Sequence, residues 1–104
     1  MLSTIKDLLG MGAKRNYEKL VKAGAIILDV RSKGEFLSGH IKGSVNIPVD
    51  QLSNNLNKLK DKHATIITCC ASGMRSASAK SILKSNGYTA VFNGGAWNSL
   101  KNKI

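Results

Sequence analysis

One short segment gathers the residues best suited to chemistry, the loop Cys70-Ala-Ser-Gly-Met-Arg-Ser76. Gly73 can adopt a positive φ, and the small residues Ala71 and Ser72 allow backbone N–H groups to converge on the centre of the loop. If the loop joins a strand to a helix that starts at Ser76, this serine is a candidate N-cap and the helix dipole adds positive potential. The segment therefore predicts a nest for an anion.

Cys70 is the candidate nucleophile of this loop. A free cysteine is only a few per cent thiolate at neutral pH, whereas a helix N-terminus or a cationic neighbour lowers its pKa to about 3.5–7.5. Arg75 supplies a cation with a forked set of donors. The alternative, in which Cys70 only fills space at a strand end, leaves the nearby glycine, arginine and helix start unexplained.

The neighbouring Cys69 receives the opposite interpretation. It ends an apolar strand, and side chains alternate across a sheet, so it should point away from whatever Cys70 faces. We expect Cys69 to pack in the core and not to act as a resolving thiol.

The elements that position the loop alternate along the chain. Apolar runs rich in β-branched residues predict strands at 25–30, 64–69 and 89–93, the last ended by Gly94-Gly95. Helical spacing predicts helices at 16–23, with Asn16 as N-cap and Gly24 as its stop, and at 50–59 and 76–86. This order predicts a small α/β domain, a mainly parallel sheet of about four to five strands with helices on both faces. Ligands of such sheets bind beyond the carboxyl ends of the strands, where the Cys70 loop lies.

Composition sets the broad class. With 104 residues, 42% of them hydrophobic and 21% charged, the chain is long enough for one soluble domain, which excludes two domains, disorder and a fibrous repeat. The two cysteines are adjacent, so no disulfide framework can form and a reducing compartment is indicated. The longest N-terminal stretch without charged or strongly polar residues, 8–13, is too short for a signal-peptide core or a membrane span. We therefore expect a cytoplasmic monomer.

The chain divides into an N-terminal extension, residues 1–15, and a single domain, residues 16–104. The extension has Leu2, Ile5, Leu8 and Leu9 at helical spacing, which predicts either a short docking helix or a packed or frayed terminus, in preference to a membrane anchor.

The charge is strongly basic, with 16 Lys and Arg against 6 Asp and Glu, a formal net charge of +10. Such a balance suits a small anionic substrate, an acidic partner protein, an anionic membrane surface or nucleic acid, and composition alone does not choose among them. Nucleic acid is disfavoured because the aromatic content is 5% and the lysines are spread from Lys6 to Lys103. The densest cluster, residues 58–62, is interpreted as a solvated helix end.

The loop and its flanking motifs resemble those of single-domain rhodaneses, the thiosulfate and related sulfurtransferases. The motifs that carry the resemblance follow the family's order and cover about residues 26–100: Leu28-Asp-Val-Arg31 with Glu35-Phe36, Gly39-His-Ile-Lys-Gly-Ser44, Asn46-Ile-Pro48, the Cys70 loop, and Gly94-Gly95 with Trp97.

The resemblance implies a rhodanese-like fold and a mechanism without a metal or organic cofactor. The Cys70 thiolate would take the outer sulfur of an anionic donor such as thiosulfate and pass it, as a persulfide, to cyanide, a thiol or an acceptor protein. Loop residues Ala71, Ser72, Gly73, Met74 and Ser76 would bind the substrate, with Met74 facing the acceptor, and Arg75 would orient the anion. In an alternative form of this hypothesis, the protein carries the persulfide to another enzyme and has little turnover of its own.

A cysteine-dependent phosphatase or arsenate reductase is the competing enzyme class. Such loops place the arginine six positions after the cysteine, whereas Arg75 comes five after Cys70. One residue is about 3.5 Å of extended chain, so the shorter ring suits a single sulfur better than a tetrahedral phosphate. Those loops also commonly have His before the cysteine, where this chain has Cys69.

The remaining motif residues receive structural interpretations. Asp29 and Arg31 are read as scaffold, and Arg31 with Glu35 has the i,i+4 spacing of a helical salt bridge. His40 is expected to support a turn through a hydrogen bond, and His63 to be solvated. Gly94 and Gly95 should let a neighbouring loop approach the cysteine. Trp97 is expected to pack in the core, in preference to lining the wall of the pocket.

Overall fold

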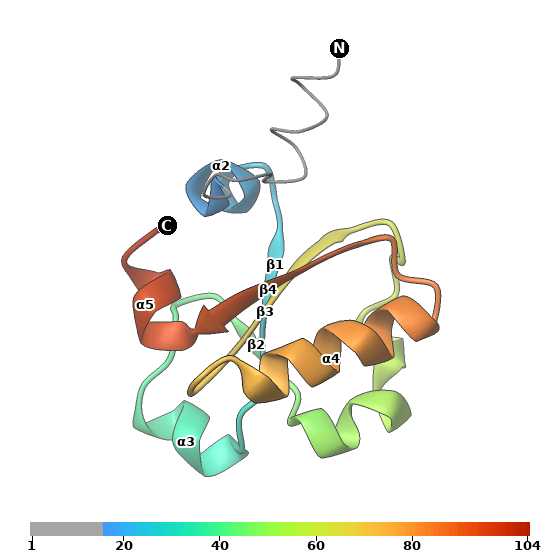
Figure 1. Cartoon of the computed structure of the whole chain (residues 1–104), viewed down its shortest axis with the longest axis horizontal. Helices are drawn as coiled ribbons and strands as arrows, with labels where there is room; N and C mark the ends of the chain where they lie inside the picture. Colours follow the sequence, from blue (N-terminus) through green and yellow to red (C-terminus); the bar gives the residue numbers. More distant parts are fainter. Residues whose placement is uncertain (1–15) are drawn as a thin grey trace.

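A four-stranded parallel sheet forms the centre of the computed structural model, which describes residues 16–104. The strand order is β2-β1-β3-β4, and every neighbouring pair is parallel. The predicted small α/β domain is therefore confirmed (Figure 1). The strands are β1 (Ile26–Asp29), β2 (Val45–Asn46), β3 (Thr65–Cys70) and β4 (Ala90–Ala96).

Helices cover both faces of this sheet, as the alternation of elements predicted (Figure 1). The helix α4 (Met74–Ser85) and the two 3₁₀ segments η1 (Val49–Asn54) and η2 (Leu56–Lys58) lie over one face. The other face carries α2 (Tyr17–Lys22) and α5 (Trp97–Lys101), while α3 (Lys33–Ser38) follows β1. The side chain of Asn16 accepts from the Lys19 N–H at 3.0 Å, so it caps α2 as predicted.

Two apolar clusters hold the layers together. Ile66 of β3 packs with Leu52 of η1 and Leu83 of α4 on one face, whereas Ile67 packs with Leu100 of α5 on the other. All five of these side chains are fully buried. Each contributes about 1.5–3 kcal/mol by leaving water, which explains why β3 is apolar at successive positions.

Segment 50–59 departs from the predicted helix. It forms two short 3₁₀ turns, η1 and η2, joined at Asn55. Asn55 donates from its side chain to the Gln51 carbonyl at 2.8 Å, which satisfies the end of the first turn locally. The break still lets Leu52 and Leu59 reach the same cluster, so burial and not helical regularity decides the path.

The strand β4 does not end at Gly94-Gly95 but runs through both glycines to Ala96. Its pairing with β3 shifts between Thr68 and Cys70, so Cys70 lies opposite Ala96. A Cβ at Gly94 would lie 2.8 Å from a methyl group of Ile67 and 2.9 Å from the Thr68 carbonyl. Glycine is therefore what allows β4 to continue against β3 at this point.

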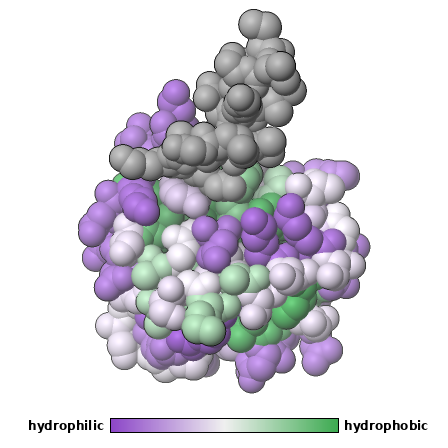
Figure 2. All heavy atoms as spheres, in the orientation of Figure 1, coloured by the Kyte–Doolittle hydropathy of each residue, from purple (hydrophilic) through white to green (hydrophobic). Residues whose placement is uncertain are grey.

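The predicted N-terminal extension, residues 1–15, lies outside the described residues. Within residues 16–104, no helix has the length and apolarity that crossing a bilayer requires. Figure 2 shows hydrophilic residues over most of the visible face, with hydrophobic ones gathered in small patches between them.

Candidate active site

The loop that follows β3 lies at the carboxyl edge of the parallel sheet. Strand β3 extends one residue beyond its predicted end and finishes at Cys70, and α4 begins at Met74. Gly73 has φ +105° and occupies the N-cap position of α4, so the predicted left-handed turn is confirmed. The predicted N-cap role of Ser76 is wrong, because this turn starts the helix two residues earlier and places Ser76 inside its first turn.

The Cys70 sulfur is surrounded by hydrogen-bond donors. The Gly73 N–H lies 2.9 Å and the Ser76 N–H 3.3 Å from Sγ, and the Cys70 thiol donates to the Ser76 hydroxyl oxygen at 3.4 Å. The residue itself is completely buried. Burial raises the pKa of the Cys70 thiol, but hydrogen bonds from the Ser76 side chain and from the N–H groups of Ser76, Gly73 and Ser72 outweigh it, and the pKa lies below its ordinary value. This environment favours a thiolate.

Cys69 lies on the opposite face of the sheet, as predicted. It packs with Ile67, Tyr17 and Leu100 in the cluster beneath α2 and α5. Burial and the nearby Asp29 carboxylate raise the pKa of the Cys69 thiol to about 12. Two adjacent cysteines thus have opposite electrostatic settings, because neighbouring residues of a strand face different layers.

Arg75 is engaged in an ion pair that the sequence did not predict. Its Nη1 and Nη2 donate to the two carboxylate oxygens of Glu35 at 2.7 and 3.0 Å. The predicted i,i+4 pair between Arg31 and Glu35 is wrong, since Arg31 reaches only the Glu35 carbonyl, at 3.4 Å. Glu35 also accepts from the Ser32 N–H in a capping box that begins α3. One carboxylate therefore ties the start of α3 to the start of α4.

Glu35→Gln is expected to change the dependence of stability on pH. Hydrogen bonds from the Arg75 guanidinium, and then from Ser32, lower the pKa of Glu35 from 4.5 to about 2. Because the folded pKa is depressed, the stabilisation is complete above the unfolded pKa and is lost as pH falls from about 4.5 toward 2. Melting temperatures measured between pH 7 and pH 2 should fall less steeply in the variant over this window. Parallel profiles would show that the ion pair contributes nothing.

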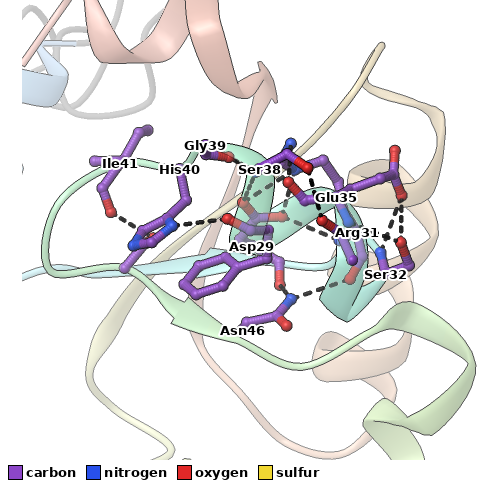
Figure 3. A network of polar contacts seen from close by, with 12 residues as sticks. Asp29, Arg31, Ser32, Glu35, Ser38, Gly39, His40, Ile41 and Asn46 are labelled. Carbon is purple, nitrogen blue, oxygen red and sulfur yellow. Dashed lines mark hydrogen bonds and ion pairs between the residues drawn. The ribbon is translucent and has the colours of Figure 1, made fainter.

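A buried ion pair between Asp29 and Arg31 lies at the end of β1 (Figure 3). Arg31 donates to both Asp29 oxygens, with Nη2 at 2.7 Å from Oδ2, and also to the Gly39 carbonyl at 2.7 Å. Its guanidinium carbon lies over the Trp97 ring, 4.5 Å from the ring centroid. Asn46 of β2 donates to the Asp29 and Arg31 carbonyls at 3.0 Å. The scaffold interpretation of Asp29 and Arg31 agrees with these contacts, which join β1, β2 and α5.

The two histidines occupy structural or solvated positions. His40 Nδ1 lies 2.8 Å from the Phe36 carbonyl, and its ring stacks on the Phe36 ring, so the predicted support of a turn is confirmed. His63 is exposed, as predicted. Trp97 is half-buried against the cluster beneath α5, consistent with a core position.

Asn93 is a site residue that sequence reasoning missed. Its side chain accepts from the Ser76 hydroxyl at 2.6 Å and from the Gly95 N–H at 2.9 Å, and it donates to the Gly73 carbonyl at 3.3 Å. The available signal was a polar residue at the end of an apolar strand, beside two glycines. The glycines do bring the segments together, because a Cβ on Gly73 would lie 3.5 Å from the Gly95 Cα.

A surface depression lies beside Arg75, which is the one residue of the loop in its lining. This depression, of about 260 Å³, is lined by Val30, Ser32, Pro48, Val49, Asp50 and Arg75. It shares Ser32, Pro48 and Asp50 with a larger one of about 530 Å³ between α3 and η1. Met74, at the start of α4, is 78% exposed. Among residues 16–104, no three His, Cys, Asp or Glu side chains are grouped to hold a metal ion.

The comparison with known proteins identifies the family. Residues 13–103 match the model of the rhodanese-like domain. The chain belongs to the rhodanese family. The human single-domain sulfurtransferase TSTD1 has 29% sequence identity and a TM-score of 0.73, with 85% of this chain and 91% of that one covered.

Two sequence relatives are sulfurtransferases. The chain is 35% identical over 69 residues to thiosulfate sulfurtransferase PspE of Escherichia coli, covering 65% of this chain and 66% of the relative. It is 31% identical over 80 residues to the tRNA sulfurtransferase of Thermoplasma acidophilum, covering 77% of this chain. The chain spans only 15% of the length of that second relative. The share of the relative that this chain covers therefore differs widely between these two sulfurtransferases.

Proposed function

We propose that the protein transfers sulfane sulfur from an anionic donor such as thiosulfate, through a persulfide on Cys70, to a thiol or to cyanide. The observation that carries this proposal is the cage of donors around the Cys70 sulfur, with Gly73 N–H at 2.9 Å and Ser76 N–H at 3.3 Å. Such donors stabilise negative charge on sulfur, both in the thiolate that attacks and in the thiolate that leaves. Membership of the rhodanese family supports the same chemistry.

The reaction proceeds in two displacements. The Cys70 thiolate attacks the outer sulfur of thiosulfate, the S–S bond of the donor breaks, and sulfite leaves with the bonding electron pair. The acceptor thiolate or cyanide then attacks the outer sulfur of the persulfide, and Cys70 leaves as a thiolate. Neither displacement requires a net proton transfer or an external oxidant. The N–H groups of residues 71–76 have the role of binding the negatively charged sulfur.

Arg75 is proposed to orient the anionic donor at the open side of the loop. Two of its five N–H groups go to Glu35, which fixes the guanidinium beside the smaller depression and leaves other donors for an anion. Cys70 is buried at rest, so a donor must reach it by local movement of the loop, whose residues Ala71, Ser72 and Gly73 are small. Met74, exposed at the helix start, is proposed to face the acceptor.

The tight fit of the loop argues against the phosphatase alternative. The Gly73 N–H lies 2.9 Å from Sγ, so the donors that would ring a phosphate already contact the cysteine sulfur. A tetrahedral anion above Cys70 would require these amides to move outward. A single additional sulfur atom requires much less displacement.

The test is a persulfide measurement with thiosulfate as the probe. After incubation and desalting, the intact mass should increase by one sulfur atom, and peptide fragmentation should place that atom on Cys70. Cyanide should then restore the original mass and release thiocyanate. An unchanged mass, or a sulfur atom located on Cys69, would overturn the proposal.

A further inference from the structure

Asn93 connects three parts of the candidate site through one side-chain amide. Its Oδ1 accepts from the Ser76 hydroxyl at 2.6 Å and from the Gly95 N–H at 2.9 Å, while its Nδ2 donates to the Gly73 carbonyl at 3.3 Å. The two backbone partners settle the orientation of the amide, because an N–H must face its oxygen and a carbonyl must face its nitrogen. Asn93 therefore presents an acceptor, not a donor, to Ser76.

The Ser76 hydroxyl has one proton and three neighbours that compete for it. Asn93 Oδ1 lies at 2.6 Å, the Gly73 carbonyl at 3.0 Å and the Cys70 sulfur at 3.4 Å. The shortest contact is the one to Asn93, and Ser76 is itself fully buried, so water does not supply an alternative partner. At rest the hydroxyl proton points to Asn93, and the oxygen lone pairs face the Cys70 thiol.

We propose that Asn93 is a positioning residue for Cys70, because it holds the Ser76 proton and thereby decides when this hydroxyl can donate to the sulfur. A thiol donates its S–H to the Ser76 oxygen and leaves the contact with Asn93 intact. A thiolate needs the hydroxyl proton, and Ser76 can supply it only by giving up Asn93 Oδ1, which keeps the Gly95 N–H. An ionised sulfur is the stronger acceptor, so the proton turns when the sulfur is charged.

This inference rests on the proposed function and refines it. When Cys70 carries the outer sulfur, Sγ is neutral and the Ser76 proton returns to Asn93. When the acceptor removes that sulfur, the electron pair of the broken bond stays on Sγ, and the proton turns toward the departing thiolate. Without Asn93 only the Gly73 carbonyl competes with the thiolate for this proton, and a thiolate is the stronger acceptor. The thiolate would therefore keep the extra donor, which makes it more stable and a weaker nucleophile.

The charged or titratable groups on the elements around Cys70 lie on α4, on α3, at the end of β1 and on β3 itself. Arg75 at the start of α4 is paired with Glu35 of α3, and Asp29 with Arg31 at the end of β1. Cys69 lies beside Cys70 on β3. The hydrogen bonds of residues 16–104 join none of these charged groups to Ser76 or to the Asn93 side chain. Changing Asn93 to an uncharged residue therefore leaves the surrounding charges in place.

The experiment follows the alkylation of Cys70 by iodoacetamide as a function of pH, with the modified peptide identified by mass. Asn93→Leu should lower the Cys70 pKa by about one unit, since the Gly73 carbonyl is then the one remaining competitor of the thiolate for the Ser76 proton. The limiting rate at high pH should fall about threefold, because thiolate reactivity decreases with its pKa. Ser76→Ala should raise the pKa.

The double variant separates positioning from a structural effect. In the S76A background, N93L should leave the Cys70 pKa unchanged, because no hydroxyl proton remains to be redirected. Asn98→Leu, the same substitution at an exposed residue of α5, is the matched control and should leave the pKa at the wild-type value. An equal shift caused by N93L in both backgrounds would overturn the proposal.

Asn93→Asp provides a second variant if N93L does not fold. It keeps an acceptor for Ser76 and for Gly95 and adds negative charge near the sulfur, so the Cys70 pKa should rise. An unchanged or lower pKa would contradict the proposal. Alkylation requires no sulfur donor, so these outcomes stay separate from the persulfide measurement: normal alkylation shifts without persulfide would reject the function and keep the role of Asn93.

Discussion

Cys70→Ala is expected to abolish persulfide formation and to lower the turnover of thiosulfate with cyanide by at least about 10³-fold. The sulfur of Cys70 is both the attacking atom and the leaving atom of the proposed reaction. The N–H groups of Gly73 and Ser76 both converge on this sulfur. Thiocyanate release and intact mass, measured in the same samples, would record the loss.

The neighbouring cysteine supplies a matched control. Cys69→Ala removes the same atom from the other face of the sheet, in the cluster beneath α2 and α5. It should cost stability of the order of 1 kcal/mol through a small cavity and leave persulfide formation on Cys70 intact. Activity that survives in C70A and disappears in C69A would reverse the assignment of the two thiols.

Breaking the Asp29–Arg31 pair is expected to produce the largest loss of stability. Arg31→Met should destabilise the fold by about 3–5 kcal/mol, because it leaves the completely buried Asp29 carboxylate without its cation. The Gly39 carbonyl and the Trp97 ring lose the guanidinium as well. A domain of this size is stable by only about 5–15 kcal/mol, so urea unfolding should show a large shift of the midpoint.

A double variant and an exposed ion pair serve as controls for the effect of burial on the Asp29–Arg31 pair. The double variant Asp29→Asn with Arg31→Met should recover part of the stability, since no unpaired charge remains buried. Lys22→Met breaks the exposed ion pair with Glu18 and should change stability by at most about 1 kcal/mol. The Lys22 side chain is 75% accessible and the Glu18 side chain 58%. Equal losses in R31M and K22M would show that burial adds nothing to the first pair.

Local sequence patterns predicted the main strands of the sheet, the turn at Gly73 and the orientation of the two cysteines. The apolar runs of β1 and β3 reveal strands covered on both faces, because each successive residue must enter one core cluster or the other. The position of Gly73 before a helical segment indicates a tight turn, and its φ of +105° follows from the same loop geometry. The opposite orientation of Cys69 and Cys70 follows from strand alternation alone.

The ends of strands and the type of helix could not be predicted from local patterns alone. Gly94 and Gly95 resemble a strand end, yet β4 continues through them because β3 approaches too closely for a side chain at Gly94. The spacing of Leu52, Leu56 and Leu59 resembles an α-helix, yet the chain forms 3₁₀ turns that bring these residues to the sheet. In both cases tertiary packing overrides the local preference.

Sequence patterns alone were sufficient to single out Cys70 and its loop as the candidate site, since cysteine, glycine and arginine lie within six residues. The partners of that loop required the folded chain. Arg75 pairs with Glu35 across 40 residues, and Ser76 meets Asn93 across 17. Periodicity reports which residues share a face of one element, and it suggested the i,i+4 pair of Arg31 with Glu35. Contacts between elements depend on strand order and on how closely backbones approach, and these are properties of the assembled sheet.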